Sequence, residues 1–314
     1  MKRLFLIDAY ALVFKYYYAF FGRPMRNRYG MNTSILFGFT KFLRDIQKRE
    51  KPDLLGVALD PKGGSFRCDI FPEYKANRPA TPEDIIASVP YLRRLLKAMR
   101  IPVYEIEGYE ADDVIGTLAF RASEAGYEVF MVTPDKDYGQ LISPNVFQYK
   151  PGKGGNEVEI IGKEQVCEHY GICEPQQVID ILTIWGDSSD NVPGIRGIGE
   201  VGAKKLIGKY GSLDNIIAHV GELPAKQQES ISSSLEQIQM SRFLVTIKRD
   251  IELPLQLSQI EIKGAQAAEI ARIFNRYEFN SLRKLLPDGL IRETSSGTPS
   301  AELQQAVAEE GMPA

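Results

Sequence analysis

The sequence predicts an α/β protein with a mostly parallel central sheet flanked by helices. Apolar runs of strand length at 4–7, 55–59 and 129–133 alternate with amphipathic helical patterns. An aspartate follows each run within two residues, and open α/β sheets place their sites at this end of the strands. With 314 residues, 44% of them hydrophobic, the chain is long enough for one large domain or for a domain with a smaller module.

The remaining elements are predicted in chain order from their periodicity and their Gly and Pro boundaries. Strands are expected at 4–7, 55–59, 103–105 and 128–133, helices at 34–49, 83–99, 111–125, 163–170 and 175–185, and a hairpin at 146–150 and 157–161 around a turn at 152–155. Later segments are expected to be helical at 225–250 and 266–275, a short strand at 260–262, a last helix after 276–282 and a tail or linker at 293–314.

Residues 61–90 interrupt the alternation with prolines and glycines, and four basic side chains accompany them: Lys62, Arg67, Lys75 and Arg78. A long insertion directly after a strand-end acid is typical of a functional loop. A solvated surface loop is the simpler interpretation. We favour the functional one, because the basic residues flank the acids.

Nine carboxylates fall at predicted strand ends or turns: Asp8, Asp60, Glu110, Asp112, Asp113, Asp135, Asp137, Asp187 and Asp190. Those at 110–113 also suit the first turn of a helix, where free N–H groups stabilise acids. Carboxylates gathered at one edge would repel one another unless a divalent cation neutralised them. Ligation by oxygen alone suits Mg²⁺ or Mn²⁺, and so many acids suggest two ions about 3.5–4 Å apart.

Composition narrows the remaining function classes. The two histidines, His169 and His219, lie in helix-like surroundings away from the acids, so a histidine base or a zinc triad is not expected. The three cysteines show no zinc-like pairing, no apolar run reaches the roughly 20 residues of a membrane span, and no signal peptide is evident, which indicates a cytoplasmic protein. Apart from the nine acids the chain is net basic, which is compatible with a phosphate substrate.

Residues 194–206 hold a glycine-rich turn that opens a lysine-bearing helix. Gly197, Gly199 and Gly202 match the dinucleotide-binding pattern, but no strand precedes them, so we reject that function. Backbone N–H groups here, with Lys204 and Lys205 beside them, suit a nucleic-acid phosphate better.

Six motifs in this order resemble one family. They are IDAY at 7–10, FPEYKANR at 71–78, EADDVIGT at 110–117, DKD at 135–137, GDSSDN at 186–191 and the glycine-rich segment 194–206. The chain from residue 3 to about 290 is similar to the 5′-nuclease (flap endonuclease-like) domain of bacterial DNA polymerase I. Pro134 departs from the glycine common in the family, without removing a ligand.

The resemblance implies a PIN-like/5′-nuclease core at 1–185 with a helical arch at 61–90, and a helical DNA-binding subdomain at 186–292 with a helix–hairpin–helix-like motif. It implies a 5′→3′ exonuclease and structure-specific 5′-flap endonuclease, with two metal ions, that leaves a 5′-phosphate in primer removal and repair. One ion would be held by Asp8, Asp60, Glu110, Asp112 and Asp135, and the other held or oriented by Asp113, Asp137, Asp187 and Asp190. Lys75 and Arg78 would be catalytic, and K⁺ would bind the glycine turn.

The expected partner is DNA, as 5′ flaps, nicked or gapped duplex and RNA primer–DNA hybrids. Its candidate contacts are Tyr10, Tyr18, Arg67, Tyr74, Gly197, Gly199, Gly202, Lys204 and Lys205, with aromatic rings available to stack on bases. We expect a monomer, either free-standing or covalently joined to polymerase domains in a longer chain.

Two alternatives share parts of this pattern. A PIN-type ribonuclease has the acidic α/β pocket but should lack the glycine turn and the basic insertion. A non-catalytic DNA-binding relative should have lost acids, particularly Asp187 and Asp190, which this chain keeps. A haloacid-type phosphatase needs Asp-x-Asp after its first strand, and residues 8–10 do not provide it.

Overall fold

A computed structural model of the chain describes residues 1–152, 157–253, 260, 266–276 and 278–283. The chain forms two compact units. Unit 1 comprises 1–9, 54–80 and 104–259, and unit 2 comprises 10–53, 81–103 and 260–314. Every one of the nine candidate metal-binding acids belongs to unit 1.

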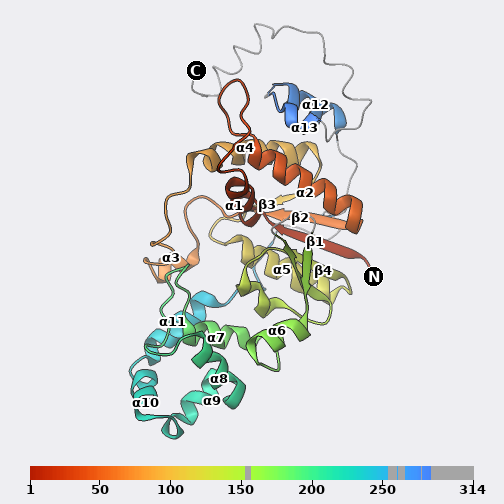
Figure 1. The fold of residues 1–314 in the computed structure, drawn as a ribbon. Coiled ribbons are helices and arrows are strands. Elements are labelled where there is room, and N and C mark those ends of the chain that lie inside the picture. The colour runs from red at the N-terminus through yellow and green to blue at the C-terminus, as the bar shows by residue number, and fades with distance from the viewer. Residues whose placement is uncertain (153–156, 254–259, 261–265, 277, 284–314) are drawn as a thin grey trace. The chain divides into compact units, whose positions relative to one another are not determined.

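The sheet has six strands in the order β3-β2-β1-β4-β5-β6 (Figure 1). Its strands are β1 (Arg3–Asp8), β2 (Leu54–Ala58), β3 (Val103–Tyr104), β4 (Glu128–Val132), β5 (Val146–Pro151) and β6 (Val158–Ile161). β1 pairs in parallel with β2 and β4, and β5 pairs in parallel with β4 and antiparallel with β6. The mostly parallel sheet and the antiparallel hairpin are therefore confirmed.

The register explains why the strand-end acids meet. Ile7 lies opposite Val57 on one side and Val132 on the other, so the three central strands end at the same edge. Asp8 closes β1, and Asp60 and Asp135 follow β2 and β4 within three residues. The order of strands, which only the fold reveals, puts these carboxylates side by side.

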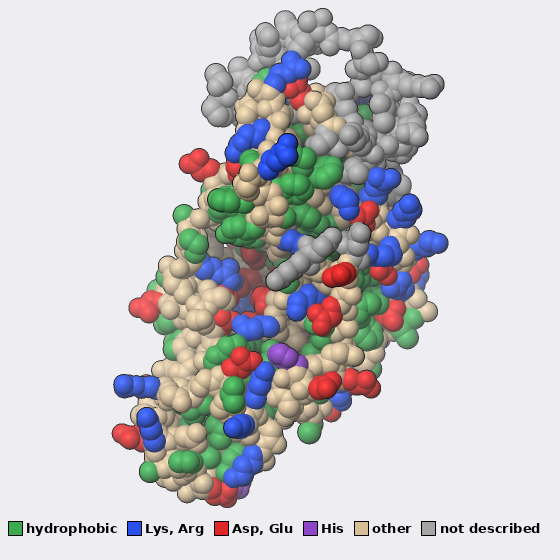
Figure 2. Space-filling model, in the orientation of Figure 1, with side chains coloured by type: hydrophobic (Ala, Val, Ile, Leu, Met, Phe, Trp, Pro, Cys, Tyr) green, Lys and Arg blue, Asp and Glu red, His purple; other side chains and the backbone are tan. Residues whose placement is uncertain are grey.

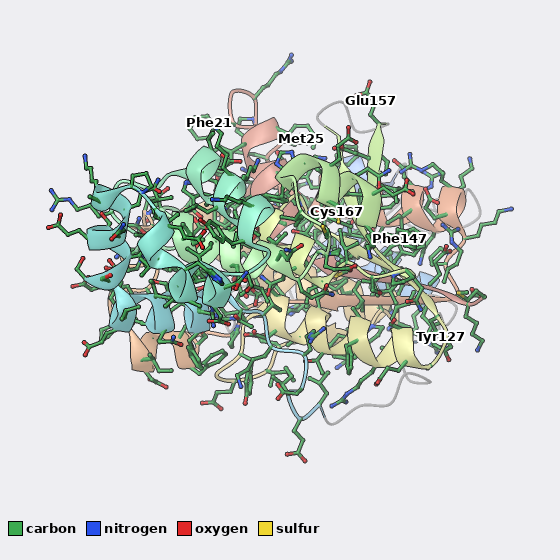
Figure 3. The ribbon with its side chains drawn as sticks, turned by 90° about the horizontal axis from the view of Figure 1, so that it is seen from below. Phe21, Met25, Tyr127, Phe147, Glu157 and Cys167 are labelled. Carbon is green, nitrogen blue, oxygen red and sulfur yellow. The ribbon has the colours of Figure 1, made fainter. Side chains whose placement is uncertain are left out.

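The core of unit 1 is built from side chains on both faces of the central strands. β1, β2 and β4 are almost entirely buried, as is usual for parallel strands covered on both faces. Phe5 stacks on Phe130 with ring centres 4.6 Å apart, and Phe130 stacks on Phe147 at 5.6 Å. Phe147, labelled in Figure 3, extends this aromatic layer to β5.

In unit 1 the first helices lie between the strands in the chain, and the later helices follow the last strand as a group of their own. They are α3 (Phe66–Ile70), α5 (Ala111–Glu124), α6 (Lys163–Tyr170), α7 (Gln177–Trp185), α8 (Glu200–Tyr210), α9 (Leu213–Ala218), α10 (Ala225–Ser232) and α11 (Leu235–Val245), with 3₁₀ turns η1 (Lys136–Leu141) and η2 (Val220–Glu222). α5 packs on β1 and β4, while α7 packs on α8 and α11. Figure 1 shows α6–α11 gathered together after the sheet.

Unit 2 is helical. It contains α1 (Ala9–Ala19, apart from its first residue), α2 (Ser34–Glu50), α4 (Glu83–Ala98), α12 (Ala267–Arg276) and α13 (Asn280–Arg283). α4 packs on α2 and α12, and Tyr91 of α4 makes an edge-on contact with Phe279 at 6.5 Å. These contacts join segments almost 200 positions apart in the sequence.

Some element predictions need correction. The helix expected at 225–250 is two helices, and residues 246–250 are not helical. The segment 61–90 contains α3 and the regular start of α4 at Glu83. The turn at 153–156, most of the strand at 260–262 and the tail at 293–314 lie outside the described residues. Within the described residues, no helix is long and apolar enough to cross a membrane.

Candidate functional site

The charges of four carboxylates act on one buried phenol. Tyr138 of η1 is 1% exposed, and its hydroxyl has no hydrogen-bond partner among the described residues. Burial first, and then the negative charges around it, raise the pKa of Tyr138 well above its usual value; those charges belong to Asp8, Asp112, Asp135 and Asp60. Carboxylates from β1, the end of β2, α5 and the end of β4 therefore lie close enough for their charges to act on the same hydroxyl.

Backbone and hydroxyl donors hold these acids in place. Thr133 donates its hydroxyl to Asp8 Oδ2 at 3.2 Å and accepts from the backbone N–H of Asp135 at 3.3 Å. Asp60 Oδ1 accepts from the N–H of Ala111 at 2.7 Å, at the first turn of α5. A free N–H at a helix start is a natural anchor for a carboxylate, so capping and clustering are compatible for this acid.

Glu110 collects donors from three neighbouring side chains. It accepts from Ser65 Oγ at 2.9 Å, Tyr74 Oη at 3.1 Å and Lys75 Nζ at 2.6 Å. Burial would raise the pKa of Glu110, but the cations of Lys75 and Arg67 outweigh it and lower that pKa below its ordinary value. Glu110 is therefore ionised and faces the loop that carries Lys75.

Asp113 is bound by a buried arginine. Its two oxygens accept from Arg67 Nη1 at 2.7 Å and Nη2 at 2.8 Å, and both side chains are at most 1% exposed. The backbone N–H of Lys248 also donates to Asp113, at 2.9 Å. This geometry speaks against the metal role expected for Asp113 and against the DNA contact expected for Arg67, because a buried bidentate pair leaves neither group free.

The predicted catalytic residues lie on a loop that docks on the turn at 187–192. The backbone N–H of Lys75 donates to the carbonyl of Asp190 at 2.9 Å, and Asn191 Nδ2 donates to the carbonyl of Glu73 at 2.8 Å. Arg78 pairs with the carboxylate of Asp190, and Lys75 Nζ lies 3.6 Å from the other oxygen of the same group. The structure thus brings Lys75, Arg78 and Asp190 together.

Lys136 makes a second cationic contact with the acids. Its ammonium lies 2.7 Å from Asp187 Oδ2 and 3.3 Å from Asp137 Oδ1. Ser189 donates its hydroxyl to Asp187 Oδ1 at 2.6 Å. Sequence reasoning missed Lys136 as a site residue, although its place between two aspartates in the DKD motif was a usable signal.

Two further site residues gave weaker signals. Ser65 precedes α3 and Tyr138 follows the DKD motif directly, but neither residue type indicates a role at such a position without the fold.

Tyr74, expected to contact substrate, is 5% exposed and its hydroxyl bonds Glu110 and Asp190. Its ring is not open for stacking on a base, so its observed contacts are those of a support for the two acids.

The crowded carboxylates have the oxygen ligands and the negative charge that a cation site needs. Burial first, and neighbouring carboxylates among the further causes, raise the pKa values of Asp60, Asp112 and Asp135 and bring that of Asp137 to about 8. Such crowding of oxygen ligands fits Mg²⁺ or Mn²⁺. Among the described residues no three acidic, His or Cys side chains are arranged to hold one ion; the ammonium groups of Lys75 and Lys136 lie against the carboxylates instead.

The glycine-rich turn has the conformation that its residues suggest. Gly197 has a φ of +81°, and Gly199 precedes the first turn of α8. A Cβ on Gly194 would lie 2.2 Å from the carbonyl oxygen of Trp185, so only glycine fits there. Lys204 pairs with Glu200 at 2.7 Å and lies over the ring of Tyr170, while the side chain of Lys205 is exposed.

The aromatic residues expected to stack on bases belong to unit 2. Tyr18 is 62% exposed, and Phe14 lies between Tyr10 and Tyr18 with ring centres 6.3 Å and 6.4 Å away. Tyr10 is half-buried. Their proposed contact with DNA stays a prediction.

Comparison with known proteins identifies the two domains of the chain first, and a relative of similar length then supports the family. A model described as the N-terminal resolvase-like domain of 5′-3′ exonucleases matches residues 3–171, and one described as their C-terminal SAM fold matches 173–268. The 5′-3′ exonuclease of Aquifex aeolicus is 33% identical over 295 residues, which cover 94% of this chain and 98% of that protein. The chain belongs to the 5′-3′ exonuclease family and is a nuclease by that membership.

Longer relatives contain the same region. DNA polymerase I of Bacillus caldotenax is 39% identical over 282 residues, which are 89% of this chain and 32% of the polymerase. This chain spans about a third of the length of that relative and of the Bacillus subtilis polymerase.

Solved structures agree with the fold. The T5 5′-exonuclease, in a structure with bound divalent zinc ions, superposes with a TM-score of 0.64 at 20% identity, covering 90% of this chain and 99% of that one. The catalytic core of Rad2 in complex with DNA substrate has a TM-score of 0.55 at 13% identity, covering 91% and 92%. At these identities the likeness concerns the fold alone.

Proposed function

We propose that this chain is a 5′→3′ exonuclease and structure-specific 5′-flap endonuclease that hydrolyses DNA phosphodiesters with two Mg²⁺ or Mn²⁺ ions. The observation that carries the proposal is that the charges of Asp8, Asp60, Asp112 and Asp135 all act on the buried hydroxyl of Tyr138, while the charge of Glu110 acts on Asp112. Family membership and the metal-bearing T5 relative support it. Primer removal and repair, on nicked or flapped duplexes, would be its tasks.

The proposed ligands differ from the expected set in one member. Asp8, Asp60, Glu110, Asp112 and Asp135 would hold one ion, and Asp137, Asp187 and Asp190 would hold or orient the other. Asp113 would instead fix the start of α5 through Arg67 and the backbone N–H of Glu110, 3.2 Å from its oxygen. When bound, divalent ions supply an activated water and neutralise charge on the phosphate.

The chain's own cations would complete the reaction site. Lys75 and Arg78 lie beside the acids on one loop, where they would offset the charge that grows on the phosphate oxygens. Water adds to phosphorus while the bond to the 3′ oxygen of the preceding nucleotide breaks, which leaves a 5′-phosphate. For Glu110 to bind an ion, Lys75 would have to release it and become available to the substrate.

The turn at 194–199 and the start of α8 would grip the duplex, with K⁺ at the glycine turn. Figure 2 shows several Lys and Arg side chains on this face of the α8–α10 region. Backbone N–H groups and cations of this kind bind phosphates without reading sequence. Lys205 is the best placed of the lysines considered, because Lys204 is already paired with Glu200.

A 5′-flap duplex labelled at its 5′ end tests the proposal. With Mg²⁺ we expect labelled oligonucleotides of flap length and labelled mononucleotides, and with EDTA we expect neither. Asp112→Asn should abolish both products while leaving duplex binding largely intact. Cleavage that persists in EDTA, or in the variant, would refute the metal-dependent site, and cleavage of single-stranded RNA in place of DNA would favour a PIN-type ribonuclease.

A further inference from the structure

Unit 1 carries a hollow that the nuclease site does not use. Three phenylalanines from separate helices line it, Phe66 of α3, Phe120 of α5 and Phe243 of α11, together with the segment 246–250. Its volume is about 470 Å³. Phe120 and Phe243 are each 40% exposed, and exposed apolar rings gathered in one patch mark an interaction site.

Two cations lie on the rim of this hollow without acidic partners. Lys248 Nζ lies over the ring of Phe66 at 5.3 Å, and the guanidinium of Arg249 lies over the ring of Phe120 at 5.2 Å. Within the described part of the chain, neither forms an ion pair. Asp250, the one acid in the lining, leaves the rim net positive.

The wall of the hollow is preformed. Buried side chains hold its backbone: Arg67 donates to the carbonyl of Thr246 at 3.0 Å, Gln140 accepts from the N–H of Ile247 at 2.9 Å, and Asp113 accepts from that of Lys248. A fixed wall lowers the entropy cost of binding a ligand.

Ring geometry favours an apolar side chain over a nucleic-acid base as the occupant. Phe66 and Phe243 meet edge to face, 5.6 Å apart at 88°, so they offer no parallel slot for a base. The rings of Phe66 and Phe120 already have cations over them. The volume of the hollow, about 470 Å³, has room for one bulky apolar anchor, and its cationic rim suits carboxylates on either side of that anchor.

We propose that this Phe66–Phe120–Phe243 hollow is a docking site for an acidic peptide segment of a partner protein, anchored by one large apolar side chain. The anchor would contact the three rings, and flanking Asp or Glu side chains would pair with Lys248 and Arg249. Such charge pairs set specificity and speed of association, while the buried anchor supplies most of the affinity. The proposal is independent of the nuclease reaction.

Fluorescein-labelled octapeptides test it by anisotropy with the intact chain. Each carries a central Trp, Phe or Leu between Asp and Glu residues; matched controls replace the anchor with Ser or the acids with Lys, and a labelled dT₈ oligonucleotide is the nucleic-acid probe. We expect an anchored acidic peptide to bind and both peptide controls to bind at least about tenfold more weakly.

Variants of residues that line the hollow test whether the peptide binds there. Phe243→Ser and the double variant Lys248→Glu/Arg249→Glu should each weaken the peptide about tenfold or more, whereas Lys226→Glu on α10 should leave it unchanged. Circular dichroism checks that each variant is folded. If one variant does not fold, the other still tests the proposal. The proposal is overturned if no anchored acidic peptide binds, if both variants bind like the parent chain, or if dT₈ binds the hollow in place of the peptides.

Discussion

At the scale of single residues, neighbouring acids make different contacts. Asp112 and Asp113 are adjacent on α5, yet the charge of Asp112 acts on Tyr138 whereas Asp113 forms a buried pair with Arg67. Successive helix residues point about 100° apart, and of these two acids Asp113 is the one that makes the bidentate pair with Arg67. The arginine that α3 supplies therefore accounts for the different contacts of the two acids.

Arg67→Met should destabilise the protein by about 3–5 kcal/mol, because it leaves the buried charge of Asp113 uncompensated. Urea denaturation measures the loss. The double variant Arg67→Met/Asp113→Leu should recover much of it, since it removes both charges. A single variant as stable as the parent would contradict the proposed support.

Lys75→Ala should slow cleavage by about 10²–10³-fold, the usual effect of losing one electrostatic stabiliser. Single-turnover rates on a flap substrate measure it, with duplex affinity followed separately. Lys62→Ala, also in the basic segment, is the matched control. Equal rates for the parent and Lys75→Ala would exclude Lys75 from the mechanism.

Asp137→Asn should stabilise the metal-free protein at high pH. Burial first, and then Asp135, raise the pKa of Asp137 from 3.8 to about 8, so the folded chain holds a proton that the unfolded chain releases above about pH 4. This contribution to stability is complete below that pH and is lost as the pH rises toward 8. In EDTA the variant should melt about 2–4 °C above the parent at pH 8.

At pH 4 the two proteins should melt together, since both then carry a neutral group at this position. Lower stability of Asp137→Asn at pH 8 would mean that the ion pair with Lys136, 3.3 Å away, outweighs the repulsion.

At the scale of elements, the site depends on a short turn meeting a short loop. The turn at 187–192 is closed by two backbone bonds between Asp187 and Val192, 2.9 Å and 2.8 Å long. Lys75 and Asn191 both have a left-handed φ, 57° and 58°, and both take part in the contact between loop and turn. Strained backbone of this kind persists where surrounding bonds hold it.

Gly194→Ala should disrupt the start of the glycine-rich segment, directly after the turn at 187–192. Its Cβ would clash with the carbonyl oxygen of Trp185, and backbone must move to relieve the contact. We expect a loss of about 1–3 kcal/mol in unfolding free energy, together with weaker duplex binding. Gly221→Ala is the control, since a Cβ there meets nothing within 4 Å; equal effects of the two would argue against a local cause.

At the scale of the whole molecule, the candidate site is acidic while the rest of the chain is net basic. The chain carries a net charge of −3, yet nine acids lie in the candidate site segments and the remaining charge is positive. Long-range attraction of an anionic substrate therefore competes with repulsion from the acids until cations neutralise them.

Lys205→Ala should weaken duplex binding across all sequences and lower the slope of log affinity against log salt by about 1. Lys204→Ala should have a smaller effect, because Glu200 already neutralises that ammonium. Filter binding in Ca²⁺ at several salt concentrations measures both. A sequence-selective loss, or a larger effect at Lys204, would contradict a phosphate contact.

The sequence by itself determined the fold class and the acids, because apolar periodicity and strand-end residues are local signals. Asp8, Asp60 and Asp135 are recognisable from the runs that precede them, and the motifs predict the family correctly.

Only the tertiary structure decided which acids face one another and which are supports. The burial of Arg67 against Asp113, the contacts of Tyr74 and the place of Lys136 depend on segments between 36 and 179 positions away, and no local pattern encodes such pairings. Side-chain direction follows from packing, and packing joins residues that the sequence keeps apart.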